Sequence, residues 1–184
     1  MSKPVPRRSA SRPARPAIVA PCTIHEFEAL DRTHSDVVVA LRRLEKLVDR
    51  LEELGEVDDT ARATATDLCA FFNSTARLHH EDEERVVFPP LLAGSNAELI
   101  QHVQRLQQDH GWLEQDWLEM EPTLSTIAEG FAWHDPALLR EMAAVFCALY
   151  IEHIALEESI VYPASKQQLS AAEDALQRRS SEPV

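Results

Sequence analysis

Apolar side chains recur every three or four residues along most of the chain, which is the spacing that places them on one face of an α-helix. The first such series runs through Phe27, Leu30, Val37, Val38, Leu41, Leu44, Val48 and Leu51. The Thr23-Ile-His-Glu26 capping box opens this helix, and Gly55 ends it. The pattern therefore predicts a first helix from residue 23 to residue 54.

Two further helices follow from the same spacing. The second begins near residues 59–60 and is expected to end at Phe88, because Pro89-Pro90 lacks the backbone N–H groups that an α-helix needs. The third opens at the Ser95-Asn-Ala-Glu98 capping box. Pro122 lies within its apolar series, so we expect this helix either to end or to kink there.

The fourth helix begins at Asp135, an N-cap that is followed by proline at the first helical position, and it is expected to end at Pro163. Residues 164–179 are expected to add a short C-terminal helix. Long helices with short connections are typical of an all-α, antiparallel up-down four-helix bundle. We therefore assign residues 23–164 to one bundle and residues 165–184 to a C-terminal helix and tail.

The segment before the bundle differs from it in composition. Residues 1–21 hold five basic side chains, five prolines and no acidic side chain. Such a segment buries too little apolar surface to order itself, so residues 1–22 are expected to form a disordered arm. A transit peptide and an electrostatic docking arm are the alternatives. No apolar stretch follows Arg7-Arg8, which argues against a twin-arginine export signal.

Composition and charge narrow the class of protein. The net charge of −13 disfavours a nucleic-acid groove on the folded body, because phosphate is repelled by an acidic surface. No apolar run approaches the ~18 residues of a membrane span, so we expect no membrane association. The chain has an odd number of widely spaced cysteines, which favours free thiols in the reducing cytoplasm: Cys22, Cys69 and Cys147.

The chain contains an internal repeat. Residues 79–89 read HHEDEERVVFP, and residues 153–163 read HIALEESIVYP. Both stretches have histidine, then two glutamates four and five residues on, then two β-branched residues, an aromatic residue and proline. His34 and His110 each lie on the preceding helix. The repeat predicts two similar helical hairpins, each with one histidine on its first helix and a His-x-x-x-Glu motif on its second.

The spacing of the repeated residues gives them a shared chemistry. Residues four apart on a helix lie on one face, so His79 can reach the same point as Glu83, and His153 the same point as Glu157. These residues lie on apolar stripes, and a carboxylate in a core must be paired, protonated or metal-bound. We therefore expect six metal ligands: His34, His79, Glu83, His110, His153 and Glu157. They suit two octahedral iron ions with an oxo or hydroxo bridge, with manganese or zinc as alternatives.

Residues 79–84 offer a second, overlapping pair, since His80 and Glu84 have the same four-residue spacing. One helix face cannot serve both pairs, because adjacent residues are ~100° apart around the axis. Aligning VVFP with IVYP places His79 on His153, whereas the other frame places His80 on Ile154, which cannot bind metal. We therefore expect His80 and Glu84 to be peripheral or to line an entrance.

The two His-x-x-x-Glu motifs with their VVFP and IVYP ends resemble the hemerythrin-like HHE cation-binding domain family over roughly residues 24–164. The resemblance implies a four-helix bundle with a non-haem di-iron centre held by the same six residues. Oxygen-carrying hemerythrins have five histidines, one glutamate and one aspartate. The four-histidine, two-glutamate set is closer to di-iron proteins that repair iron–sulfur clusters, but those usually carry an N-terminal domain that residues 1–21 do not supply.

These observations predict a protein that binds or senses dioxygen, nitric oxide or peroxide, or that handles iron. No residue outside the ligand set resembles a general base or a nucleophile, so we expect a binding module rather than a dedicated enzyme. Iron–sulfur cluster repair and consumption of nitric oxide or peroxide are alternatives at the same centre. A metal-free scaffold or histidine-phosphotransfer bundle is a further alternative, although phosphotransfer needs an exposed histidine. Any protein partner is unknown.

Overall fold

The structure is a computed structural model that describes residues 24–132 and 135–181. Within these ranges every regular element is helical and no strand is present. The α-helical segments are α1 (Ile24–Leu54), α2 (Asp59–Phe71), α3 (Arg77–Asp82), α4 (Phe88–Leu92), α5 (Ala97–Ala128), α6 (Pro136–Leu156) and α7 (Tyr162–Ser181). The arm over residues 1–22 and the Thr23 cap that the sequence predicts lie outside the described residues.

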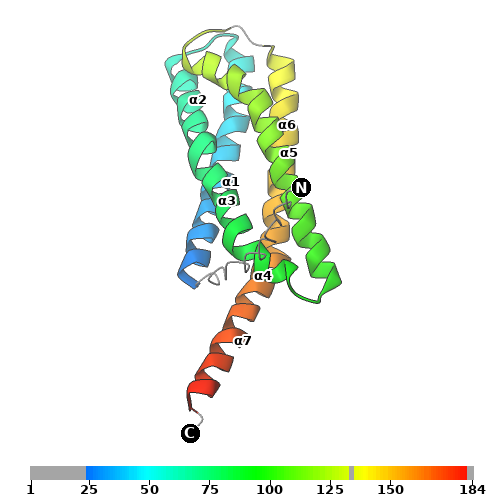
Figure 1. Cartoon of the computed structure of the whole chain (residues 1–184). Coiled ribbons are helices and arrows are strands. Elements are labelled where there is room, and N and C mark those ends of the chain that lie inside the picture. The colour runs from blue at the N-terminus through cyan, green and yellow to red at the C-terminus, as the bar shows by residue number, and fades with distance from the viewer. Residues whose placement is uncertain (1–23, 133–134, 182–184) are drawn as a thin grey trace, which may run out of the picture.

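Three π-helical turns join these segments into longer rods. Residues Phe72–Ala76 join α2 to α3, residues Glu83–Val87 join α3 to α4, and residues Glu157–Val161 join α6 to α7. The described chain therefore forms four helical rods: α1, α2–α4, α5 and α6–α7. Figure 1 shows these rods lying side by side.

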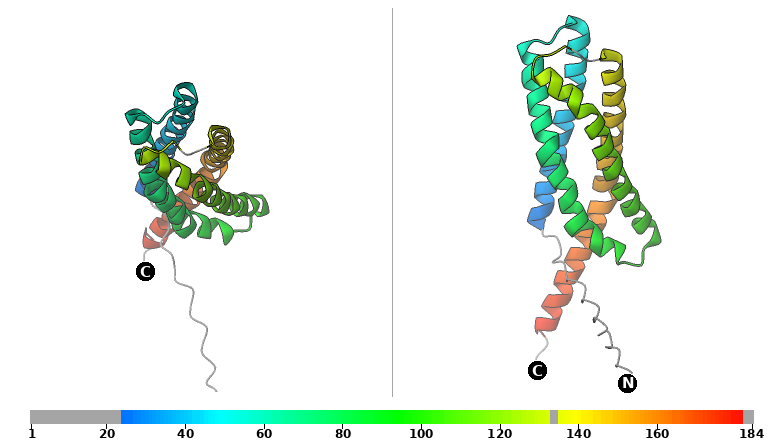
Figure 2. Two further views of the ribbon diagram at one scale, coloured as in Figure 1. Left: turned by 90° about the horizontal axis from the view of Figure 1, so that it is seen from above. Right: turned by 45° about the horizontal axis from the view of Figure 1, so that its top comes forward.

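The four rods form a closed ring of neighbours. Helix α1 packs against α2 and α6, and α5 packs against the same two helices on the opposite side. This arrangement is a helical bundle, as the sequence predicts. Helix α7 continues beyond the bundle, and the right view in Figure 2 shows it projecting past the ends of the other helices.

Most helix ends lie at the residues that the sequence marks. Gly55 adopts a positive φ of 66° after α1, a conformation that favours glycine. The Asp135 side chain caps α6 by accepting hydrogen bonds from the next backbone N–H groups. The cap of α5 was predicted at Ser95 but lies one residue later, because the Asn96 side chain accepts from the Leu99 N–H at 3.2 Å.

The expected helix ends at the prolines are wrong. The second rod continues through Pro89 and Pro90 to residue 92, and the fourth continues through Pro163 to residue 181. In both rods a π-helical turn comes immediately before the prolines, so each proline falls in the first turn of a new α-helical segment. The residue before each of Pro89 and Pro163 donates its N–H across the π-helical turn, from Phe88 to Glu83 and from Tyr162 to Glu157, so the α-helical hydrogen-bond register changes just before the proline.

Helix α5 also continues through a proline, because Pro122 lies inside it. The sequence left open whether this proline ends or kinks the helix, and the helix is not ended. Figure 1 shows the C-terminal part of α5 bending across the top of the bundle. A proline inside a helix removes one hydrogen bond and crowds the preceding turn, which is a common cause of such a bend.

Two apolar cores hold the rods together, and a polar layer separates them. The larger core includes Val37 to Leu51 on α1, and the smaller core includes Phe27 and Leu30 on the same helix. The other rods divide in the same way, with α5 contributing Leu106 to the smaller core and Leu113 to the larger. The layer between the cores holds the predicted ligands, so packing fixes their height in every rod. Over the described residues, no helix combines the length and apolar character needed to span a membrane.

Candidate metal centre

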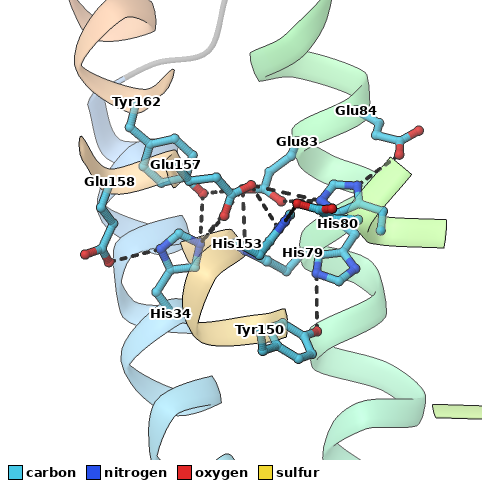
Figure 3. A network of polar contacts seen from close by, with 12 residues as sticks. His34, His79, His80, Glu83, Glu84, Tyr150, His153, Glu157, Glu158 and Tyr162 are labelled. Atoms are coloured by element: carbon cyan, nitrogen blue, oxygen red, sulfur yellow. Dashed lines mark hydrogen bonds and ion pairs between the residues drawn. The ribbon is translucent and has the colours of Figure 1, made fainter. Parts of the chain in front are cut away.

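The fold brings all six predicted ligand residues into the polar layer between the two cores. Each of them is at most 6% exposed: His34, His79, Glu83, His110, His153 and Glu157. Figure 3 shows the histidine rings and the two carboxylates converging from different rods. The six residues come from four rods, and each helical hairpin supplies two histidines and one glutamate as the repeat predicts.

One half of this cluster lies between α1 and the second rod. The Nε2 atom of His34 lies 3.1 Å from Glu157 Oε2 and 3.9 Å from Glu83 Oε1. The Nε2 atom of His79 lies 3.5 Å from Glu83 Oε1. Each of these four residues has one donor atom within 4.8 Å of a donor atom on the other three. The first half thus offers two imidazoles and two carboxylates to one cation.

The second half uses the same two carboxylates. The Nε2 atom of His153 lies 3.2 Å from Glu157 Oε1. The Nε2 atom of His110 lies 3.5 Å from Glu83 Oε2 and 4.0 Å from Glu157 Oε1. Donor atoms of these four residues also lie within 4.8 Å of one another. The two halves therefore share Glu83 and Glu157, which is the arrangement that two adjacent cations bridged by carboxylates need.

Two outer glutamates hold one histidine of each half. Glu84 contacts His110 Nδ1 at 2.9 Å, and Glu158 contacts His34 Nδ1 at 3.1 Å. Each glutamate thus reaches a histidine of the other hairpin. A carboxylate at Nδ1 keeps the proton there and leaves Nε2 free to bind a cation. The sequence predicted a peripheral Glu84, and this residue is half-exposed, but reasoning from the sequence missed the role of both outer glutamates although the repeat contained them.

A buried carboxylate supports a third histidine. Asp109 is 1% exposed, and its Oδ2 atom lies 3.9 Å from His153 Nδ1. Arg105 lies 3.6 Å from the same oxygen, so a cation partly balances the charge of Asp109. The sequence reasoning did not identify Asp109. An acid on the apolar stripe, three residues after Leu106 and four before Leu113, was the available signal.

Tyr162 is a further site residue that the sequence reasoning missed. Its hydroxyl donates a hydrogen bond to Glu83 Oε1 and lies 3.2 Å from His34 Nε2. Its ring stacks on His34 with centroids 5.2 Å apart, while the equivalent aromatic residue of the other hairpin, Phe88, stacks on His110 at 5.6 Å. Burial and the Glu83 and Glu157 carboxylates raise the pKa of Tyr162, so its phenol stays protonated.

His80 lies nearer to the cluster than its peripheral assignment suggests. Its ring stacks on His110 with centroids 4.1 Å apart, and its donor atom lies within 4.8 Å of those of His110 and His153. The Tyr150 hydroxyl is 3.2 Å from His80 Nε2. His80 also lines a cavity beside the cluster.

The buried charges of the cluster are strongly coupled. Burial lowers the pKa of His153, but the Glu157 carboxylate beside it more than compensates and raises this pKa to about 10. Burial raises the pKa of Glu157, yet His153 and His34 together lower it to about 2. Burial lowers the pKa of His79 to about 4. Protons on imidazoles thus take the place of cations beside the carboxylates.

The donor set fits metal ions better than it fits protons alone. Several buried nitrogen and oxygen atoms that could bind metal have no hydrogen-bond partner, among them Glu83 Oε2, His110 Nε2, His153 Nε2 and both oxygens of Glu157. Unpaired buried polar atoms are costly, and a bound cation would satisfy them together. Imidazole nitrogen with carboxylate oxygen is a donor set that suits iron, manganese or zinc.

Comparison with known proteins also indicates a cation-binding domain. The family model for the hemerythrin HHE cation-binding domain matches residues 25–165. The chain therefore belongs to this cation-binding family, and its buried histidine and glutamate groups can hold metal. A protein from Haemophilus influenzae (strain ATCC 51907 / DSM 11121 / KW20 / Rd), described as uncharacterized, is 30% identical over 146 residues, which cover 79% of this chain and 81% of that protein. No solved structure matches the chain significantly.

Proposed function

We propose that this protein is a non-haem di-iron protein that binds or senses a small ligand such as dioxygen, nitric oxide or peroxide. The observation that carries the proposal is the sharing of Glu83 and Glu157 by two groups of four donors. A single metal site needs only one such group. Two groups with both carboxylates in common support two adjacent ions with bridging glutamates.

The donor count supports an open centre. Each half contributes two imidazole nitrogens and two carboxylates, which is four protein donors for one ion. An octahedral ion takes six donors, so positions are left for an oxo or hydroxo bridge and for one small exogenous ligand. When bound, iron would supply redox-active coordination chemistry, while manganese or zinc would fit the same donors without the same redox range.

The protein's own residues hold and orient these donors. The outer glutamates fix the Nδ1 protons of His34 and His110, and Asp109 faces Nδ1 of His153. Tyr162 keeps a proton against Glu83. The apolar cores above and below keep the six inner side chains nearly fully buried. We also infer that the rods alternate in direction as an antiparallel up-down bundle, which the short connections between them support.

The arrangement favours a binding or sensing module over the other candidate functions. Histidine phosphotransfer needs an exposed imidazole, and the four ligand histidines are nearly fully buried. Iron–sulfur cluster repair and turnover of nitric oxide or peroxide would use the same centre, so they stay as alternatives.

The stoichiometry of iron tests the proposal. Protein reconstituted anaerobically with Fe²⁺ should contain two iron ions per chain by elemental analysis, and azide should change the absorption spectrum of its oxidised form. A ratio near one, or no retained iron, contradicts the dinuclear centre. Zinc as the sole metal retained would leave the fold unaffected and contradict the redox role.

A further inference from the structure

A cavity of about 360 Å³ lies beside the second half of the centre, the half that contains His110 and His153. Its walls come from the α2–α3 part of the second rod, from α5 and from α6. Phe72, Trp117 and Phe146 form an aromatic floor, with ring centroids 4.9 and 5.2 Å from Phe72. The volume lies within the range of small-molecule pockets, roughly 300–1,000 Å³.

A glycine leaves the mouth of this cavity open. Gln107, Gly111, Glu114 and Leu118 all line the cavity from α5, at the spacing of one helix face. Glycine inside a helix is unfavourable relative to alanine, so its presence needs a reason. Gly111 does not have a positive φ, and an added Cβ would meet no atom within 4 Å. Neither the backbone nor the packing requires glycine here, and its effect is to leave this part of the cavity lining without a side chain.

The inner end of the cavity reaches the centre through His80. This side chain and His110 both line the cavity, and their rings stack on each other. Tyr150, which also lines the cavity, holds His80 Nε2 through its hydroxyl at 3.2 Å. The imidazole of His80 thus lies where the cavity meets the centre, with its donor atom within 4.8 Å of those of His110 and His153.

The first half of the centre is closed by comparison. A second cavity of about 280 Å³ lies on its side and touches His79, with Ala29 in its wall. The donor atoms of this half are covered by Tyr162, whose ring stacks on His34 and whose hydroxyl contacts both His34 and Glu83. This phenol occupies the space beside His34 Nε2 and Glu83 Oε1 that a ligand of this half would need.

We propose that the cavity beneath Gly111 is the route by which a ligand of two or three heavy atoms reaches the His110 and His153 half of the centre, with His80 as the inner barrier. This inference rests on the proposed function, because it needs a metal with an open position. The cavity is larger than the ligand, so the small molecule can occupy it first and reach the metal when the His80 side chain moves aside.

Azide binding followed by stopped-flow absorption tests the route in the iron-loaded, full-length protein. Gly111→Phe places a side chain in the mouth and should slow both azide binding and azide release by about tenfold or more, with the Kd nearly unchanged. A route alters the path but not its end states, so both rates should change together. His80→Ala should speed both rates. Ala29→Phe puts the same side chain in the second cavity and serves as the matched control, with rates equal to those of the unaltered protein.

Measuring iron content distinguishes failure of the proposed function from failure of the route alone. If the unaltered protein does not retain two iron ions, or if it retains them and azide never binds, the proposed function fails. If two ions are present and azide binds, equal rates in Gly111→Phe and the unaltered protein overturn the route alone, as does slowing by Ala29→Phe instead. A changed Kd in Gly111→Phe with unchanged iron content would show an effect on the centre itself and would also overturn the route.

Discussion

At the scale of single residues, the choice between two overlapping motifs decides the site. The structure places Glu83 among the donors of both halves, whereas Glu84 contacts only the outer nitrogen of His110. We expect Glu83→Ala to lose one or both iron ions. Glu84→Ala should retain two ions at saturating iron but bind them roughly 10- to 100-fold more weakly, because His110 is less well oriented. Elemental analysis and competition with a chelator measure the two effects, and the opposite pattern would contradict the register.

Tyr162 gives a second test at this scale. Its hydroxyl donates to a buried carboxylate, and hydrogen bonds to charged groups are worth more than neutral ones. Tyr162→Phe should therefore lower the free energy of unfolding of the metal-free protein by about 2 kcal/mol. Tyr150→Phe, which removes a contact to the neutral His80, is the matched control and should cost about 1 kcal/mol. Urea unfolding in the presence of a chelator compares them, and a larger loss for Tyr150→Phe would disagree with this account.

The sequence predicted the six residues that converge in the polar layer but not the residues that contact them from outside. His79 with Glu83, and His153 with Glu157, are each four residues apart, so helix geometry alone predicts that they meet. Contacts such as Glu158 with His34 join residues 124 positions apart, and no local rule gives them. The repeat showed that each motif carries a second glutamate, but only the packing of the hairpins shows that this glutamate reaches across to the other one.

At the scale of helices, the start of α5 offers a direct test of the corrected cap. The Asn96 side chain accepts the hydrogen bond from Leu99 N, and Ser95 lies outside the helix. Asn96→Ala should lower the free energy of unfolding by about 1 kcal/mol, the usual loss for an N-cap. Ser95→Ala is the control, and it should change the stability little. A larger loss for Ser95→Ala in urea unfolding would restore the cap that the sequence predicted.

The helices were largely predictable, and their continuation through prolines was not. Apolar spacing and caps locate all four rods, because both signals are local. The π-helical turns that begin at Glu83 and Glu157 have no comparable sequence signal, and they are what lets the rods pass Pro89 and Pro163. Both turns start at a shared carboxylate. π-helical turns are frequent at functional sites, so the same local distortion that admits the prolines also belongs to the centre.

At the scale of the whole molecule, one layer of charge links the two hairpins in addition to the two apolar cores. Each carboxylate faces histidines from both hairpins, as Glu157 does with His34 and His153. Without metal, protons on these imidazoles balance the carboxylates. Because protons balance the carboxylates only when metal is absent, the free energy of unfolding should change with pH differently in the metal-free and the metal-bound protein.

The direction in which folding shifts each pKa determines how stability changes with pH. His153 has a pKa of about 10 in the fold, above its usual value of about 6.5, so its contribution to stability is complete below pH ~6.5 and is lost as the pH rises through about 10. His79 has a pKa of about 4, so its contribution is present above pH ~6.5 and is lost as the pH falls toward 4. Glu157, at about 2, stays ionised throughout this range. The His153 and His79 contributions to the stability of the metal-free bundle are therefore both present near pH 6.5.

Metal binding should reverse the trend above that pH. A bound cation replaces the proton on His153 and needs a neutral imidazole, so protons compete with metal less as the pH rises. The increase in Tm caused by Fe²⁺ should therefore grow from pH 6 to pH 8, while the Tm of the metal-free protein falls over the upper part of this range. Anaerobic thermal unfolding with Fe²⁺ and with a chelator measures both curves. A metal-free Tm that stays constant over this range, together with a gain that does not rise with pH, would mean that the charge layer does not hold the hairpins together.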